Sequence, residues 1–181
     1  MSTAKFKALV HYVVASCDDP QSLGATRLNK ILWFADTTVY RKTGASITGE
    51  TYVKRQRGPV PKTILKTIRE LEQAGKIHVR EKEFAGYKMR LFIPLEEPDV
   101  SLFSPVELEV VKAISEEICG RHTANSISEL SHDQIWAAAK DGEEIPLYAT
   151  LASKRGEFTP KIAAWADLVL ESMKASQQHA A

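Results

Sequence analysis

Apolar residues recur at helical spacing in the first part of the chain and predict two amphipathic helices. The first runs from about Thr3 to Ser16 and ends before Pro20. The second follows a polar loop that contains Gly24; Thr26 is its expected cap, and Gly44 is expected to end it in the left-handed conformation. The apolar stripe of this second helix consists of Leu28, Ile31, Leu32, Ala35 and Val39.

A second ridge lies beside that stripe, formed by Asn29, Trp33, Asp36 and Tyr40, which are four, three and four residues apart. Two interpretations are open. The rings can widen the core contact while the polar side chains bond locally, or the ridge can be a contact surface for a partner. The core interpretation is the simpler one, because aromatic residues at helical spacing usually serve the core.

Residues 47–61 predict an extended segment followed by a stiff turn. The segment Ile47–Val53 is rich in threonine and alternates partly, as a strand or an extended arm does. In Gly58-Pro59-Val60-Pro61 the prolines fix their own backbone angles and keep the preceding residues out of the helical region, so we expect a rigid elbow. Pro61 then suits the first position of a helix that ends at Gly75.

Apolar and polar residues alternate on both sides of Ala85-Gly86, between Ile77 and Ile93. This pattern predicts a half-buried β-hairpin. A helix followed by a hairpin is the second half of a winged helix, a class that often binds DNA. A nucleic-acid function therefore has to be weighed.

The last third of the chain is expected to be helical. Ser104-Pro105-Val106-Glu107 combines a capping box with proline at the first helical position. Residues 123–151 predict two short helical pieces, the second capped by Ser131, and a last helix begins at Thr159-Pro160. The predicted fold class is α+β, mostly α, with a central β-hairpin. We expect one domain over residues 1–175 and a flexible tail over 176–181.

Composition narrows the class of protein. The chain has 181 residues, of which 44% are hydrophobic and 26% charged, so it suits one ordinary globular core and not a disordered chain. A net charge of +1 argues against attraction of the whole molecule to nucleic acid or membranes. Because the first residues suit an amphipathic helix better than a signal peptide, we expect a cytoplasmic protein with Cys17 and Cys119 as free thiols.

Catalytic and cofactor motifs are missing from the sequence. The nine glycines form no phosphate-binding loop. Cys119, His122 and His132 have uneven spacing and make a weak case for a metal site. Ser131-His132-Asp133 cannot act as a hydrolytic relay because neighbouring helical residues point in different directions, whereas His132 and Trp136 share a face. We expect no enzyme activity, no metal and no cofactor.

Basic residues gather around the expected elbow. Between Lys54 and Glu70 there are six, accompanied by one acid: Lys54, Arg55, Arg57, Lys62, Lys66 and Arg69. A solvated surface explains them most simply. The two functional alternatives are a patch for a phosphate backbone and a patch for an acidic protein surface.

Three separated blocks resemble one family: LNKILWFAD, then TGASITGETYVKRQRGPVP, then ELSHDQIWAAAKDGEEIPLY. They are similar to the Panacea domain, also called the SocA-like antitoxin domain. The characteristic positions of that family fall here on Leu28, Lys30, Phe34, Ala35, Asp36, Thr48, Gly49, Tyr52, Gly58, Pro59, Val60, Ser131, His132 and Trp136. Trp33 stands where the family usually has tyrosine.

The resemblance implies a type II antitoxin that neutralises a toxin by direct protein contact. SocA itself hands its toxin to the ClpXP protease, so an adaptor role is a second form of the same hypothesis. We expect the partner surface to comprise Trp33, Asp36, Tyr40, Tyr52, Lys54, Arg55 and Arg57. A homo-oligomer is compatible with this hypothesis. The alternative is a winged-helix transcriptional regulator that uses Lys62, Lys66 and Arg69 on DNA.

Overall fold

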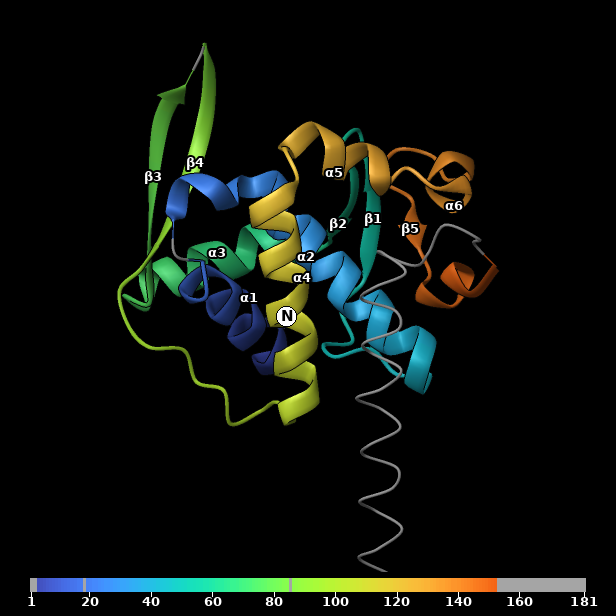
Figure 1. Ribbon diagram of the computed structural model, residues 1–181, viewed down its shortest axis with the longest axis horizontal. Coiled ribbons are helices and arrows are strands. Elements are labelled where there is room, and N and C mark those ends of the chain that lie inside the picture. Colours follow the sequence, from blue (N-terminus) through green and yellow to red (C-terminus); the bar gives the residue numbers. More distant parts are fainter. Residues whose placement is uncertain (1–2, 18, 85, 153–181) are drawn as a thin grey trace, which may run out of the picture.

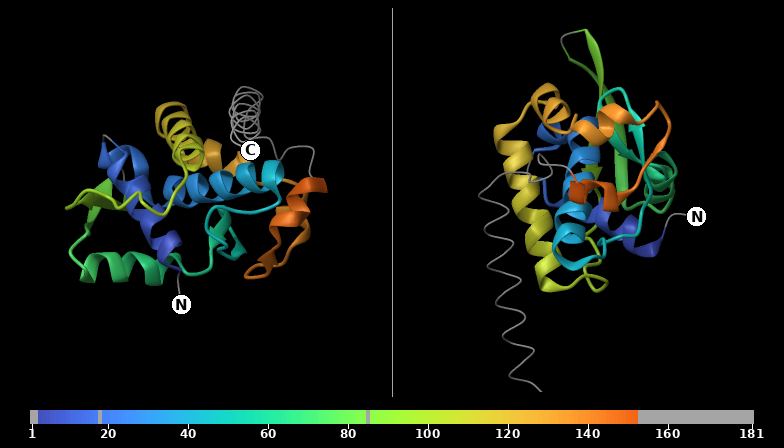
Figure 2. Two further views of the ribbon diagram at one scale, coloured as in Figure 1. Left: turned by 90° about the horizontal axis from the view of Figure 1, so that it is seen from below. Right: turned by 90° about the vertical axis from the view of Figure 1, so that its right-hand side faces the viewer.

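The computed structural model describes residues 3–17, 19–84 and 86–152, and its centre is one long helix. This helix, α2 (Pro20–Thr43), contacts α1 (Ala4–Ala15) and α4 (Pro105–Arg121) as well as strands of both sheets. Figures 1 and 2 show α2 between α4 on one side and the β1–β2 strand pair on the other. Leu28, Ile31, Leu32 and Ala35 of the apolar stripe are buried as a consequence, and Val39 is half-buried.

The start of α2 differs from the expectation. Asp19 caps the helix by accepting a hydrogen bond from the Gln21 amide, and Pro20 occupies its first position. Gly24, with φ of 58° and ψ of 167°, then kinks the helix instead of lying in a loop before it. The long helix thus begins just after Gly24, close to the expected start at Thr26, and the sequence analysis missed only the short helical turn that Asp19-Pro20 starts before the kink. Gly44 ends the helix in the left-handed conformation, as predicted, with φ of 77°.

A three-stranded antiparallel sheet replaces the expected elbow. Strands β1 (Tyr52–Arg55) and β2 (Gly58–Pro61) form a hairpin, and β5 (Glu144–Ile145) pairs with the other edge of β1. Pro59 lies opposite Lys54, whose amide and carbonyl bond to Glu143 and Gly142 on the far edge. Proline is tolerated in β2 because no backbone N–H is needed at this position for a hydrogen bond to β1.

The helix and hairpin that follow agree with the sequence pattern, except at their start. Helix α3 (Ile64–Gln73) begins after Pro61, which belongs to β2, and Gly75 follows its end. Strands β3 (Ile77–Phe84) and β4 (Tyr87–Pro94) pair antiparallel from Ile77 opposite Pro94 to Phe84 opposite Tyr87. The hairpin extends away from the body of the molecule in Figure 1. The predicted hairpin is thus confirmed.

The last described segment combines short elements. Ser104 and Glu107 form the predicted capping box of α4, and α5 (Ala124–Leu130), α6 (Gln134–Ala138) and the short helix η1 (Leu147–Ala152) follow. The cap of α6 is Asp133, which accepts hydrogen bonds from the Ile135 and Trp136 amides, so the assignment of this role to Ser131 was wrong. The helix expected from Thr159 lies outside the described residues.

The predicted fold class is confirmed: helices dominate, with a β-hairpin and a small antiparallel sheet. The core is shared by α1, α2 and α4, and its most buried side chains include Phe6, Leu9, Leu32, Val111 and Ile114. Within the part of the chain that the structure describes, no helix is both long and apolar enough to cross a membrane.

Candidate functional site

A buried lysine ties α2 to the β1–β2 hairpin. Lys30 is 1% exposed, and its Nζ donates a hydrogen bond to the carbonyl oxygen of Pro59 over 2.7 Å. Burial lowers the pKa of Lys30 to about 7. The ammonium group therefore lies in an environment that disfavours its charge. Such buried titratable groups usually have a structural or functional role.

Gly58 makes this approach possible. Its φ of 97° lies in the region that favours glycine, and a Cβ placed there would lie 2.1 Å from Ser131 Oγ and 2.6 Å from Lys30 Nζ. The Ser131 hydroxyl is itself held by a hydrogen bond to the Ser128 carbonyl. One residue from each of the three separated blocks, Lys30, Gly58 and Ser131, thus meets the others in space, although no local pattern places them together.

A buried carboxylate holds the loop before β1. Asp36 is 0% exposed and accepts hydrogen bonds from the Thr48 amide at 3.0 Å, the Thr48 hydroxyl at 2.6 Å and the Tyr52 hydroxyl at 2.7 Å. Burial raises the pKa of Asp36, and the three hydrogen bonds oppose that rise. Gly49, with φ of 67°, turns the chain directly after Thr48.

Three residues expected at the partner surface lie inside the molecule. Trp33, Asp36 and Tyr52 are 4%, 0% and 1% exposed, and the Trp33 and Tyr52 rings meet edge to face at 5.0 Å. The physical reason is that the segment from Thr48 to Tyr52 packs over this side of α2. The core interpretation of the ridge was the right one for Trp33 and Asp36, and direct partner contact through these three side chains was wrong for this conformation.

Helix α6 is fastened to the same hairpin. The Trp136 and His132 rings stack at 3.7 Å with 9° between their planes, which confirms that they share a face. Trp136 Nε1 donates to the Arg55 carbonyl over 3.0 Å, and Lys54 Nζ lies 4.3 Å from the Trp136 ring while donating to the Ala139 carbonyl at 2.8 Å. Burial, together with the nearby charges of Lys30 and Lys54, lowers the pKa of His132.

The other expected contact residues differ in their exposure. Arg55 is exposed and lies 3.4 Å from the Asp141 carboxylate, Arg57 is exposed in the β1–β2 turn, and Tyr40 is half-buried. Val60 is half-buried and lies opposite Val53 in the strand pair. Two of the residues expected on DNA are paired with acids: Lys62 with Glu144 at 2.7 Å and Lys66 with Glu70 at 3.7 Å.

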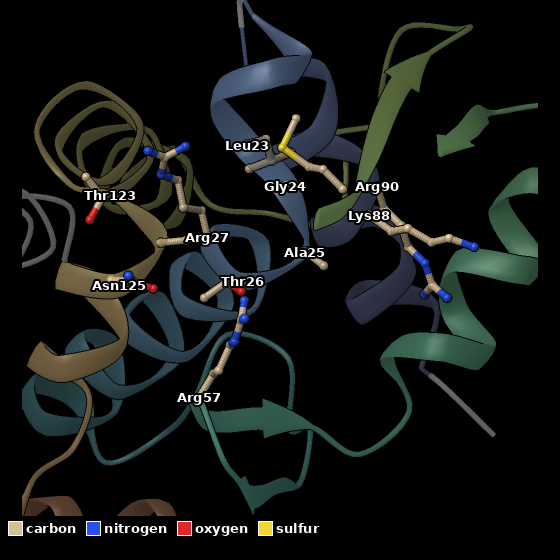
Figure 3. Close-up of a pocket in the computed structure, with 12 residues that line it drawn as sticks. Leu23, Gly24, Ala25, Thr26, Arg27, Arg57, Lys88, Arg90, Thr123 and Asn125 are labelled. Atoms are coloured by element: carbon tan, nitrogen blue, oxygen red, sulfur yellow. The ribbon is translucent and has the colours of Figure 1, made fainter. Parts of the chain in front are cut away.

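A cavity of about 660 Å³ opens between the kink of α2, strand β4, the β1–β2 turn and the start of α5. Figure 3 shows Arg27 and Arg57 beside the cavity, whereas the side chains of Lys88 and Arg90 extend from β4 away from the other labelled residues. Among its described lining residues none is acidic, and four are basic: Arg27, Arg57, Lys88 and Arg90. We call this set the cationic rim.

The members of the cationic rim are held to different degrees. Arg27 is anchored, because its guanidinium donates to the Ser22 and His122 carbonyls. Arg90 lies 4.0 Å from Glu81. Arg57 and Lys88 are exposed and have no hydrogen bond or ion pair within the described residues. Sequence reasoning found Arg57 alone, since the rim comes from three distant segments.

A second cavity, of about 390 Å³, adjoins the first and shares Ala25, Thr26 and Arg57 with it. It reaches Lys30 and Asn29. Asn29 Oδ1 is buried without a hydrogen-bond partner in the described part of the chain. Such an atom usually finds a water molecule or a ligand, so the cavity has an unused acceptor beside its cations.

Comparison with known proteins places the sequence in a family. The family model described as "Antitoxin SocA-like, Panacea domain" matches residues 28–137, which is more than half of the chain. The chain belongs to this Panacea family. No curated protein and no solved structure matches the chain.

The matched range of the Panacea domain runs from α2 to α6 and contains Lys30, Asp36, Gly58, Ser131 and Trp136. Most of these residues hold backbone segments together. The Ser131-His132-Asp133 run of the Panacea domain is divided among different partners: Ser131 bonds to Ser128, His132 stacks on Trp136 and Asp133 caps α6. Within the described residues, no group of three histidine, cysteine or acidic side chains could hold a metal ion.

Proposed function

We propose that this Panacea protein is an antitoxin that neutralises a cognate toxin by direct protein contact and without catalysis, in the cytoplasm. The observation that carries the proposal is the family match over residues 28–137, because the matched family is one of antitoxins. The geometry supports a binding role, since the motif residues fix backbone positions and leave an open cavity beside them.

The cationic rim is the best candidate for the contact surface. Two of its side chains, Arg57 and Lys88, are exposed and unpaired within the described residues, and Arg55 is exposed nearby in the same turn. An acidic segment of the toxin would complement this surface, and complementary charge speeds association and selects the partner. Lys54 contributes indirectly, because its contacts with α6 hold the turn in place.

The rim is better suited to a protein than to DNA. Two of the basic residues that would meet a phosphate backbone are paired with acids: Lys62, just before α3, with Glu144, and Lys66, in α3, with Glu70. The whole chain carries a net charge of only +1. Nucleic-acid binding usually shows as a continuous basic face.

The proposal is tested by recovering the partner. The tagged full chain is used to capture proteins from extract of its own cells after nuclease treatment, and bound proteins are identified by mass spectrometry. We expect one small protein in near-stoichiometric amount that is toxic when expressed alone. Retention on duplex DNA at low salt, with no protein partner, would instead favour the winged-helix regulator.

Two charge-reversed variants then locate the surface. The double variant R57E/K88E alters the rim, and the matched variant K66E/R69E makes the same charge change on α3, outside the cavity. We expect R57E/K88E to raise the Kd for the toxin about tenfold or more and K66E/R69E to leave it nearly unchanged. The opposite pattern would move the contact surface to α3.

Delivery of the toxin to ClpXP is the adaptor form of the same proposal. It requires that the toxin be degraded faster when the antitoxin is present. The half-life of the toxin with and without this chain, in cells with and without ClpX, separates delivery from simple blockade.

A further inference from the structure

Two sulfur atoms from distant parts of the chain lie in contact. Cys17 follows α1, and Cys119 lies in the last turn of α4, 102 residues later. Their Sγ atoms are 3.8 Å apart and both residues are half-buried, so a small oxidant can reach them. The sequence contains no other cysteine.

We propose that Cys17 and Cys119 are a modification site, at which a peroxide converts the two thiols into an intramolecular disulfide. The present distance is an unbonded contact, and a disulfide bond is about 2 Å long. A change in side-chain rotamer brings the two atoms together without a new chain path, because the sulfurs already face each other.

The environment of Cys17 suits it to react first. Its sulfur lies near the Cys119 thiol and 3.3 Å from the Ser22 hydroxyl. Hydrogen bonding from the Cys119 thiol, and from Ser22, lowers the pKa of Cys17. The pKa of Cys119 is raised, because its hydrogen bond to Cys17 and its burial both disfavour the thiolate. The thiolate is the reactive form, so the pair has one nucleophile and one resolving thiol.

The chemistry balances with one peroxide. The Cys17 thiolate attacks a peroxide oxygen, the O–O bond breaks, and Cys17 becomes a sulfenic acid while one water leaves. Cys119 then attacks the Cys17 sulfur, the S–O bond breaks, and a second water leaves. Two thiols lose two electrons in total, and the peroxide is reduced to two water molecules.

The bond would join two walls of the large cavity. Cys17 precedes the kinked start of α2, and Cys119 precedes Thr123–Asn125; both following segments line the cavity. Arg27 already links these segments by donating from Nε to the His122 carbonyl over 2.8 Å. A disulfide would add a covalent link beside this hydrogen bond and fix the separation of the walls.

The test uses the full chain and hydrogen peroxide as the probe. We expect tryptic mass spectrometry under non-reducing conditions to recover Cys17 and Cys119 peptides as one cross-linked species, which dithiothreitol separates. Closing a loop of this length should raise the Tm by about 10 °C, reversibly. Neither C17S nor C119S should show the cross-link or the rise.

Two controls keep the result interpretable. The reduced forms of C17S and C119S must melt near the reduced wild type, which shows that serine itself does not disturb the fold. A non-reducing gel distinguishes the intramolecular bond from a disulfide between two chains. Recovery of separate sulfinic or sulfonic acids, or of cross-linked dimers alone, would overturn the proposal. Its outcome does not depend on whether a toxin is found.

Discussion

Lys30 and Arg57 both lie near the start of β2, yet their surroundings are opposite. Lys30 is 1% exposed and donates to the Pro59 carbonyl, whereas Arg57 is exposed in the turn and unpaired within the described residues. The Lys30 ammonium group holds the β2 backbone, whereas the Arg57 guanidinium group is accessible to a partner. The difference separates the molecule into a buried scaffold and a cationic rim.

The scaffold contains most of the motif residues and the rim contains few of them. Lys30, Gly58 and Asp36 fix the hairpin and its preceding loop, whereas Lys88 and Arg90 come from β4, outside the three motif blocks. We infer that the motif residues hold the hairpin, whereas the exposed surface beside it is the part proposed to contact the toxin.

Replacing Gly58 by alanine should give the largest loss of stability. The new Cβ would meet Ser131 Oγ at 2.1 Å and Lys30 Nζ at 2.6 Å, and the φ of 97° is strained for alanine. Both neighbours are buried and hydrogen-bonded, so they cannot move cheaply. We expect a loss of about 4 kcal/mol in the free energy of unfolding, measured with urea.

Gly49→Ala is the matched control for this variant. Gly49 also has a positive φ, of 67°, but nothing lies within 4 Å of its added Cβ. Backbone strain alone should cost about 1 kcal/mol. Equal losses for the two variants would show that the close approach of the three blocks contributes nothing, and the scaffold would lose its central contact.

Sequence reasoning predicted the parts of this scaffold that depend on neighbours in the chain. The capping box at Ser104, the left-handed Gly44 and the β3–β4 hairpin were confirmed because local spacing decides them. The prediction of an elbow at Gly58 was wrong because β2 forms only by pairing with β1, which local spacing does not reveal. Pro59 fits into this pairing because the backbone of the opposite residue, Lys54, bonds to Gly142 and Glu143 instead.

The candidate site was harder to predict for the same reason. Asp36 and Tyr52 were identified by the family resemblance, but their burial depends on a loop that folds back over α2. The cationic rim joins residues of α2, the β1–β2 turn and β4, and no periodicity in the sequence brings these together. The family resemblance therefore identified the motif residues, and tertiary packing determines which contacts each of them makes.

Tyr52→Phe should give the second largest effect on the scaffold. The variant removes the hydroxyl that lies 2.7 Å from the buried Asp36 carboxylate. A hydrogen bond to a charged group contributes about 2 kcal/mol, and we expect a loss of that size in urea unfolding. Tyr148→Phe is the control, since Tyr148 is 66% exposed and should change stability very little. If Tyr52→Phe leaves the free energy of unfolding unchanged, the hydrogen bond to Asp36 does not stabilise the attachment of β1.

The buried Lys30 should make stability depend on pH. The pKa of Lys30 is about 7 in the folded protein and near the ordinary lysine value of 10.5 in the unfolded chain. Between these values the unfolded chain binds more protons, so stability rises with pH. We expect a gain of about 1.5 kcal/mol from pH 7 to pH 8.5 in the wild type, measured by urea unfolding.

Lys30→Met isolates this contribution. Methionine has similar length and no charge, so other titrating groups remain while the Lys30 contribution disappears. The stability of the wild type relative to the variant should therefore rise by about 1.5 kcal/mol from pH 7 to pH 8.5. If the difference in the free energy of unfolding between wild type and variant stays constant across this range, Lys30 keeps its proton throughout. Lys30 and Arg57 would then differ in burial but not in charge.

Glutamine substitutions at Lys54 and Arg57 should give the smallest effects and mark the boundary between scaffold and rim. Lys54 contacts the Trp136 ring and the Ala139 carbonyl, so Lys54→Gln should cost about 1 kcal/mol in urea unfolding. Arg57→Gln should stay within about 0.5 kcal/mol of the wild type, because Arg57 is exposed and unpaired in the described residues. Equal losses would place Arg57 in the scaffold. A loss of stability for Lys54→Gln but not for Arg57→Gln would place Lys54 in the scaffold. Arg57, three residues away in the same hairpin, would then keep its proposed role in binding.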